Sequence, residues 1–175
     1  MRQFVVALFL SFVLAGAVPA FAQTSSARVC VAEVATREPS ISPTAVRDAL
    51  IKFLSKQKGF EAEEVPLDTS DAAEAMTQAK DKKCDYLINA TVSEAHSESG
   101  YTTTPAGGVS AQNGVNLLTF FVTTNYKLIK LSDGTEQASG SFKASDRGSA
   151  QSAVIATTKK IAEKVAGSVK SGAAK

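Results

Sequence analysis

The sequence predicts an α/β domain built on a mixed sheet of about five strands and closed by a C-terminal helix. Three observations favour this class. Before residue 93, short runs rich in β-branched residues alternate with segments of helical periodicity, as in strand–helix–strand units. After residue 93, two strand patterns flank an Asp-Gly turn, and the final segment is again helical in period. The predicted order is βαβαβββα, and the pattern leaves open whether the helices make two layers or three.

The first strand and helix carry clear local signals. Residues 28–34 are apolar at both alternating sets of positions apart from Arg28 at the start and Glu33, which is typical of a central strand covered on both faces. Ser42 and Pro43 then indicate the N-cap and first residue of a helix. Apolar residues recur at helical spacing from there until Gly59, where we expect the helix to stop.

The next three elements complete a second crossover. Residues 60–65 alternate and precede a proline, which favours a strand near an edge of the sheet. Ser70 is expected to cap the second helix, and residues 85–92 to form the third strand. Since strands separated by single helices need crossover connections, these three strands should be parallel neighbours.

The second half predicts a hairpin and a closing helix. Residues 117–131 form one long strand, and residues 136–144 return antiparallel after the Asp-Gly turn. Residues 149–169 place their apolar side chains on one helical face. The segment 97–116 is rich in Gly, Ser and Thr and nearly uncharged, so we expect a flexible arm that is either functional or a disordered tip.

The N-terminal segment resembles a secretory signal peptide. Residues 4–17 are apolar apart from one serine, a run too short for a membrane-spanning helix, and the small residues Ala20 and Ala22 fit the cleavage rule. We expect residues 1–22 to be removed and residues 23–175 to form a single exported domain, periplasmic or secreted. An uncleaved N-terminal anchor is the alternative.

The amino-acid composition excludes collagen-like, coiled-coil and disordered polyampholyte proteins. The 175 residues are 44% apolar and 21% charged, which is ordinary for a globular domain. A net charge of only +2 gives no general electrostatic reason to expect a nucleic-acid partner.

Two cysteines, Cys30 and Cys84, would sit in an oxidising compartment after export, where pairing is favoured. A bridge between them would close a loop of about 55 residues, worth roughly 4 kcal/mol in the chain-entropy model. Two buried unpaired cysteines are the alternative.

No catalytic or metal-binding set is visible in the sequence. His96 is the single histidine, and no nucleophile motif surrounds any serine, so a catalytic triad is not indicated. His96 with Glu94 or Glu98 lacks the further ligands that a metal site needs. We therefore expect no enzyme activity, no cofactor and no metal, and we expect His96 to face solvent at a strand end.

A partner-binding surface is expected where the arm rejoins the sheet. The candidates are Tyr101 in the arm and four apolar residues that follow it. Alternation puts Leu118 and Phe120 on one face, and Leu117 and Phe121 on the other. One face can meet the helices, whereas the other is solvated, covered by the arm or used as an interface.

The third strand, Cys-Asp-Tyr-Leu-Ile-Asn-Ala-Thr-Val over residues 84–92, and the hairpin Tyr-Lys-Leu-Ile-Lys-Leu-Ser-Asp-Gly-Thr over residues 126–135 carry a family resemblance. The chain resembles the CsgG and TolB N-terminal-domain group, which includes LpoB-like proteins, over most of residues 28–169. The resemblance implies a bacterial envelope protein that binds other proteins or assembles and carries no catalytic constellation. This chain departs from the lipid-anchored secretion members because no anchor cysteine follows the leader.

The function expected from this resemblance is a non-catalytic exported module that contacts another envelope protein. Membrane contact is expected to be peripheral or absent, and the sequence does not predict an oligomeric state. A periplasmic small-ligand carrier is one alternative and would need a closed apolar pocket. A subunit of an outer-membrane secretion assembly is another, although only residues 117–122 form a continuous apolar run there.

Overall fold

The computed structural model describes residues 27–102 and 115–173, so the expected signal peptide, residues 1–22, lies outside the described residues. The predicted α/β class and element order are confirmed. The elements in chain order are β1 (Arg28–Val31), α1 (Pro43–Leu54), β2 (Glu63–Pro66), α2 (Ala72–Asp81), β3 (Tyr86–Thr102), β4 (Val115–Lys130), β5 (Glu136–Asp146) and α3 (Ala150–Ala173).

The five strands form one mixed sheet in the order β2-β1-β3-β4-β5. β1 pairs in parallel with both β2 and β3, as the crossover argument predicts, whereas β3, β4 and β5 pair antiparallel. The first strand is central and covered on both faces, since Val29, Cys30 and Val31 have no exposed surface. β1 ends at Val31, earlier than predicted, and β2 is correspondingly short, because only residues facing β1 pair.

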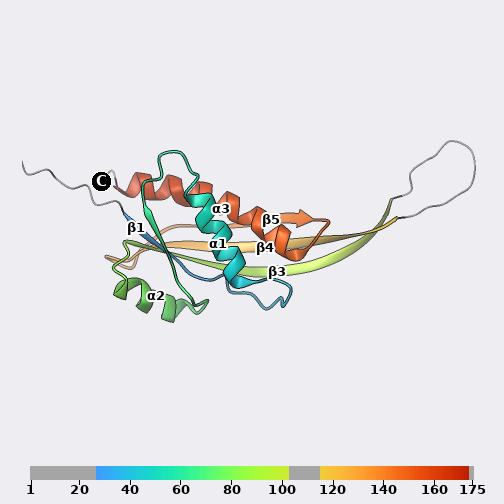
Figure 1. Ribbon diagram of the computed structural model, residues 1–175, viewed down its shortest axis with the longest axis horizontal. Coiled ribbons are helices and arrows are strands. Elements are labelled where there is room, and N and C mark those ends of the chain that lie inside the picture. The colour runs from blue at the N-terminus through green and yellow to red at the C-terminus, as the bar shows by residue number, and fades with distance from the viewer. Residues whose placement is uncertain (1–26, 103–114, 174–175) are drawn as a thin grey trace, which may run out of the picture.

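The helices cover the sheet unequally (Figure 1). α1 and α3 pack on one face, where Leu50, Ile161, Ile88 and Leu128 belong to one large buried cluster. α2 lies on the opposite face, where Leu67 and other residues of β1, β3 and α2 form a smaller cluster. Burying a Leu or Ile side chain contributes about 1.5–3 kcal/mol, so the larger cluster dominates the stability of the fold. The molecule has three layers where α2 lies and two elsewhere.

The helix starts follow capping chemistry. Ser42 caps α1 as predicted, because its Oγ accepts a hydrogen bond from the Ala45 amide at 3.4 Å. The prediction that Ser70 caps α2 is wrong: Asp71 is the N-cap, and one of its carboxylate oxygens accepts from the amides of Ala73 and Glu74 at 2.9 Å. A carboxylate at this position also interacts favourably with the positive end of the helix dipole.

The third strand is much longer than predicted. β3 continues past the expected end at residue 92, through a bulge between Val92 and Glu94, to Thr102. Residues 97–102 and 115–116, which the sequence assigned to a flexible arm, therefore belong to β3 and β4, and residues 103–114 lie outside the described residues. The antiparallel hydrogen-bond ladder needs no apolar alternation, which is why composition did not indicate these strand residues. In Figure 1 this part of β3 and β4 runs beyond all three helices.

Among the helices that the structure describes, none combines the length and the apolar character that crossing a membrane would require.

Candidate functional site

The candidate site is the outer part of the β3–β4 hairpin, residues 94–102 and 115–121, which we call the hairpin extension. All of the predicted partner residues lie on it. Tyr101 pairs with Asn116 in the backbone register, although its side chain is outside the described part. Leu117, Leu118, Phe120 and Phe121 follow one another along β4, so the fold brings the predicted apolar residues onto one strand.

The two faces of the extension differ. Leu118 and Phe120 share a face with Thr124, whose hydroxyl bonds to Thr157 of α3 at 2.9 Å, so this face is the one that α1 and α3 cover. Phe120 packs against the large core cluster, but Leu118 lies further out and is 46% exposed. Among the described residues, Leu118 is the exposed large apolar side chain. Phe121 is half-buried on the opposite face.

His96 lies on that opposite face, directly across from Phe121. Its ring stacks on the Phe121 ring, with centroids 5.3 Å apart. Its Nδ1 lies 3.6 Å from a Glu94 oxygen, and its Nε2 lies 3.5 Å from a Glu98 oxygen. The expectation that His96 stands at a strand end is wrong, because β3 continues past it, but its side chain is 46% exposed.

His96 and its two glutamates form a small polar cluster on the sheet surface. The Glu94 carboxylate accepts a hydrogen bond from the Thr123 hydroxyl at 3.1 Å, which orients it along the sheet surface. Over the described ranges, no group of three or more His, Cys, Asp and Glu side chains converges as metal ligands would. The cluster presents two carboxylates and an aromatic surface.

Two open grooves border the extension. One, of about 560 Å³, lies between the loop 35–38 and residues 91–95 of β3. The other, of about 310 Å³, lies beside His96 and Phe121 and reaches Lys143 of β5. Both are lined by mixed polar and apolar side chains, so neither is the closed apolar pocket that a small-ligand carrier would need.

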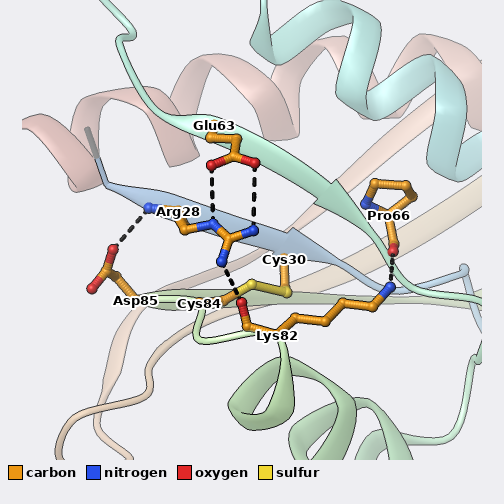
Figure 2. The surroundings of a disulfide bond; sticks show 7 residues. All are labelled: Arg28, Cys30, Glu63, Pro66, Lys82, Cys84 and Asp85. Carbon is orange, nitrogen blue, oxygen red and sulfur yellow. Dashed lines mark hydrogen bonds and ion pairs between the residues drawn. A yellow bond between two sulfur atoms is a disulfide. The ribbon is translucent and has the colours of Figure 1, made fainter. Parts of the chain in front are cut away.

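At the opposite end of the sheet, a disulfide and an ion pair link neighbouring strands (Figure 2). Cys30 and Cys84 form a disulfide with Cα atoms 5.8 Å apart, so the paired alternative for the two cysteines is the one observed. Arg28 beside it bonds to Glu63 of β2 at 3.0 Å and to the Lys82 carbonyl at 2.5 Å. These contacts join β1, β2 and the α2–β3 connection, and they fix the base from which β3 runs out to the extension.

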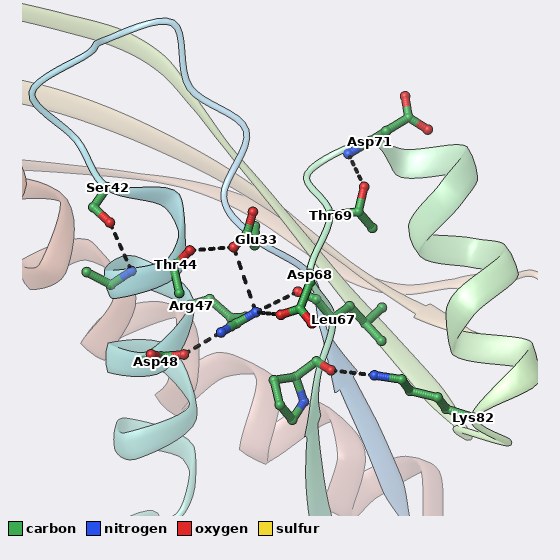
Figure 3. A network of polar contacts seen from close by, with 12 residues as sticks. Glu33, Ser42, Thr44, Arg47, Asp48, Leu67, Asp68, Thr69, Asp71 and Lys82 are labelled. Carbon is green, nitrogen blue, oxygen red and sulfur yellow. Dashed lines mark hydrogen bonds and ion pairs between the residues drawn. The ribbon is translucent and has the colours of Figure 1, made fainter.

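A buried arginine was not indicated by the sequence (Figure 3). Arg47 of α1 is 7% exposed and donates to the Leu67 carbonyl at 2.9 Å and to Asp68 at 2.5 Å. It also contacts Asp48 at 3.0 Å. Burial alone would lower the pKa of Arg47, but the hydrogen bonds to Asp68 and Asp48 outweigh that effect and raise it. Arg47 thus holds α1 to the loop after β2, and this role is structural.

No family model and no curated protein matches the sequence. The fold is similar to solved structures. A PelC variant from Paraburkholderia phytofirmans, described as a dodecamer, has a TM-score of 0.52 at 18% identity, covering 79% of this chain and 86% of that one. Protein XCC0632 from Xanthomonas campestris has a TM-score of 0.54 at 13% identity, covering 86% of this chain and 89% of that one.

The LpoB C-terminal domain from Salmonella enterica is also among the matched structures, with a TM-score of 0.41 at 11% identity, covering 69% of this chain and 85% of that one. Its TM-score is too low to establish a common fold. The likeness to PelC and to XCC0632 shows a shared fold alone, because the identities are low. The resemblance to the CsgG and TolB N-terminal-domain group therefore stays a prediction.

Proposed function

We propose that this chain is a non-catalytic, exported assembly module of the bacterial cell envelope, which binds a protein partner through the hairpin extension. The observation that carries the proposal is the extension itself. Outward of Phe120, its two strands run past all three helices (Figure 1), and Leu118 is exposed at their surface.

A two-stranded ribbon is marginally stable by itself in water, because it buries little apolar surface and leaves its outer edges unpaired. The extension combines both features, since Ser97, Glu98 and Gly100 are exposed on β3 while Leu118 is exposed on β4. A bound partner would bury the apolar side chain and cover the edges. The extension is therefore the surface that gains most from association.

The chemistry of the described residues supports a binding role over catalysis. His96 is flanked by two carboxylates and an aromatic ring, with no cysteine or serine arranged as its nucleophile partner. The open, mixed-polarity grooves support a surface for a macromolecule more than a site for a small ligand. The described dodecameric state of the PelC variant gives one example of this fold within an assembly.

The test is chemical crosslinking of the exported chain in an envelope extract, comparing wild type with Leu118→Asp. We expect the wild type to capture a partner and Leu118→Asp to lose it, because burying an unpaired charge at the contact is costly. The matched control is Ser132→Asp, which adds the same charge to an exposed residue in the turn after β4.

Thermal unfolding followed by circular dichroism checks that both variants remain folded. Capture that survives Leu118→Asp, or that is lost equally with Ser132→Asp, contradicts the proposed role of the extension.

A further inference from the structure

We infer that the helical layer of the molecule is a contact surface for an anionic phospholipid membrane. The helical layer comprises α1, α3 and the loop 55–62 that follows α1. This contact goes beyond the proposed function, because it uses the outer face of the helices and not the hairpin extension. Three features of the exposed charges support it: their sign, their arrangement and their residue type.

The exposed charges of the helical layer are mostly positive. Over the described residues of this layer, seven exposed lysines accompany three exposed carboxylates, a net charge of +4. The whole sequence carries only +2, so the positive charge of the molecule is concentrated here. The carboxylates are Asp48, Glu61 and Glu163, and Asp48 already pairs with Arg47 at 3.0 Å. The lysines are Lys52, Lys56, Lys58, Lys159, Lys160, Lys164 and Lys170.

The lysines of α3 occupy one stripe along the helix. Lys159, Lys160, Lys164 and Lys170 all lie on the exposed face, opposite the residues that α3 buries. Lys160 and Lys164 are four positions apart, where like charges destabilise a helix. The helix dipole favours cations only near the last turn, which explains Lys170 but not the other three lysines of this 24-residue helix. Local helix energetics therefore do not account for the stripe.

The lysines at the end of α1 lie on the same side of the molecule. α1 and α3 pack together on one face of the sheet (Figure 1). The Lys170 ammonium donates to the Lys58 carbonyl, which joins the end of α3 to the loop after α1. Lys52 is in the last turn of α1, and Lys56 follows just after it. Within residues 27–102 and 115–173, no ion pair joins any of the seven lysines to a carboxylate.

The residue type fits a diffuse anionic surface. All seven cations are Lys, a hydrated point charge on a flexible stem, whereas defined recognition of a single carboxylate or phosphate favours the planar fork of Arg. Clusters of about four to eight basic residues attract anionic lipid surfaces. The two open grooves described above are lined by residues of the strands and of the loop 35–38, not by α1 or α3. The outer face of the helices therefore suits a flat membrane.

The hairpin extension has the opposite charge. Glu94 and Glu98 have side chains that are 55% and 66% exposed. Residues 94–102 and 115–121 contain no lysine or arginine. An anionic membrane would therefore attract the helical layer and not the extension, so a membrane-bound molecule keeps the extension available for its protein partner.

The test is co-sedimentation of the exported chain, with its disulfide intact, with two kinds of vesicle. One contains phosphatidylcholine alone, and the other contains equal parts of phosphatidylglycerol and phosphatidylcholine. At about 0.1 M salt, where charges more than about 10 Å from the membrane are screened, wild type should bind only the vesicles with phosphatidylglycerol. Lys160→Glu/Lys164→Glu should weaken this binding at least about tenfold, because two attractive charges become repulsive.

The matched control is Lys80→Glu/Lys83→Glu, which makes the same change in charge at exposed positions near the end of α2, on the opposite face of the sheet (Figure 1). It should bind the vesicles like wild type. Leu118→Asp should also bind them like wild type, because the extension is not the membrane contact. Circular dichroism checks that every variant is folded.

Wild type that fails to bind phosphatidylglycerol vesicles, or that binds both kinds equally, overturns the membrane contact and leaves the crosslinking test of the extension unaffected. Equal loss of binding with Lys80→Glu/Lys83→Glu also overturns it, because net charge and not the helical layer would then be the cause. If vesicles stay unbound while Lys160→Glu/Lys164→Glu loses capture in the envelope extract, an acidic protein takes the place of the membrane.

Discussion

The position of the buried Arg47 side chain is fixed by its hydrogen bonds to the loop after β2. Its guanidinium donates to the buried Leu67 carbonyl and to the exposed carboxylate of Asp68, and the other buried residues of this helix are apolar. Arg47→Ala should lower the free energy of unfolding by about 2 kcal/mol, because a buried acceptor left without a donor costs about 1–3 kcal/mol. Urea unfolding measures the loss. Arg37→Ala, at an exposed arginine, is the control and should change stability by less than about 0.5 kcal/mol.

Asp133 in the β4–β5 turn has a lowered pKa. The largest cause is the hydrogen bond from the Thr135 hydroxyl at 2.7 Å, followed by the Thr135 amide at 3.0 Å. A lowered carboxyl pKa stabilises the turn above the ordinary value of 3.8, and that stability is lost as the pH falls through the lowered pKa. Thr135→Val should move the pKa of Asp133 up towards 3.8 in a ¹³C NMR titration. An unchanged pKa would show that the hydroxyl bond is not its cause.

Single residues differ in how far the sequence predicts them. Ser42 was predicted as a cap because its signal is local: a small hydroxyl residue followed by proline. Arg47 was not, since the groups that make its burial tolerable come from the loop after β2, about 20 positions away. The spacing of residues along the chain does not predict contacts between such distant positions.

At the scale of elements, the disulfide joins β1 to the start of β3 and closes 54 positions of chain. Cys30→Ala/Cys84→Ala should lower the free energy of unfolding by about 4 kcal/mol in the chain-entropy model, because the unfolded chain regains its freedom. Guanidinium unfolding measures the effect. Dithiothreitol should destabilise wild type by a similar amount and leave the double variant unaffected. A reductant effect on the variant would point to a cause other than this bond.

The strands show why part of the candidate site escaped prediction. β1 and the start of β3 are buried on both faces, so their apolar residues mark them. Residues 97–100 are polar or small and exposed, and only pairing with β4 makes them a strand. The long strand that carries Leu117 to Phe121 was predicted, whereas the extended shape that presents Leu118 depends on pairing with β3.

At the scale of the whole molecule, stability is distributed unevenly along its length. At one end, the disulfide, the Arg28 contacts and both buried clusters surround β1. At the other end, the part of the hairpin extension outward of Phe120 has cross-strand pairing and runs past the helices (Figure 1). The module is thus anchored at one end and available for association at the other.

This gradient predicts a break in hydrogen exchange within one strand. In dilute, monomeric protein, amides of residues 86–90 should exchange slowly, because they lie among fully buried side chains and open only with the whole domain. Amides of residues 97–100 should exchange at least about a hundredfold faster, because the exposed ribbon can open while the body stays folded. The change should fall near the bulge between Val92 and Glu94, where the register shifts. Exchange measured residue by residue by NMR locates it. Uniform protection along β3 would mean that the extension is held by the body itself, and that a partner has little left to stabilise.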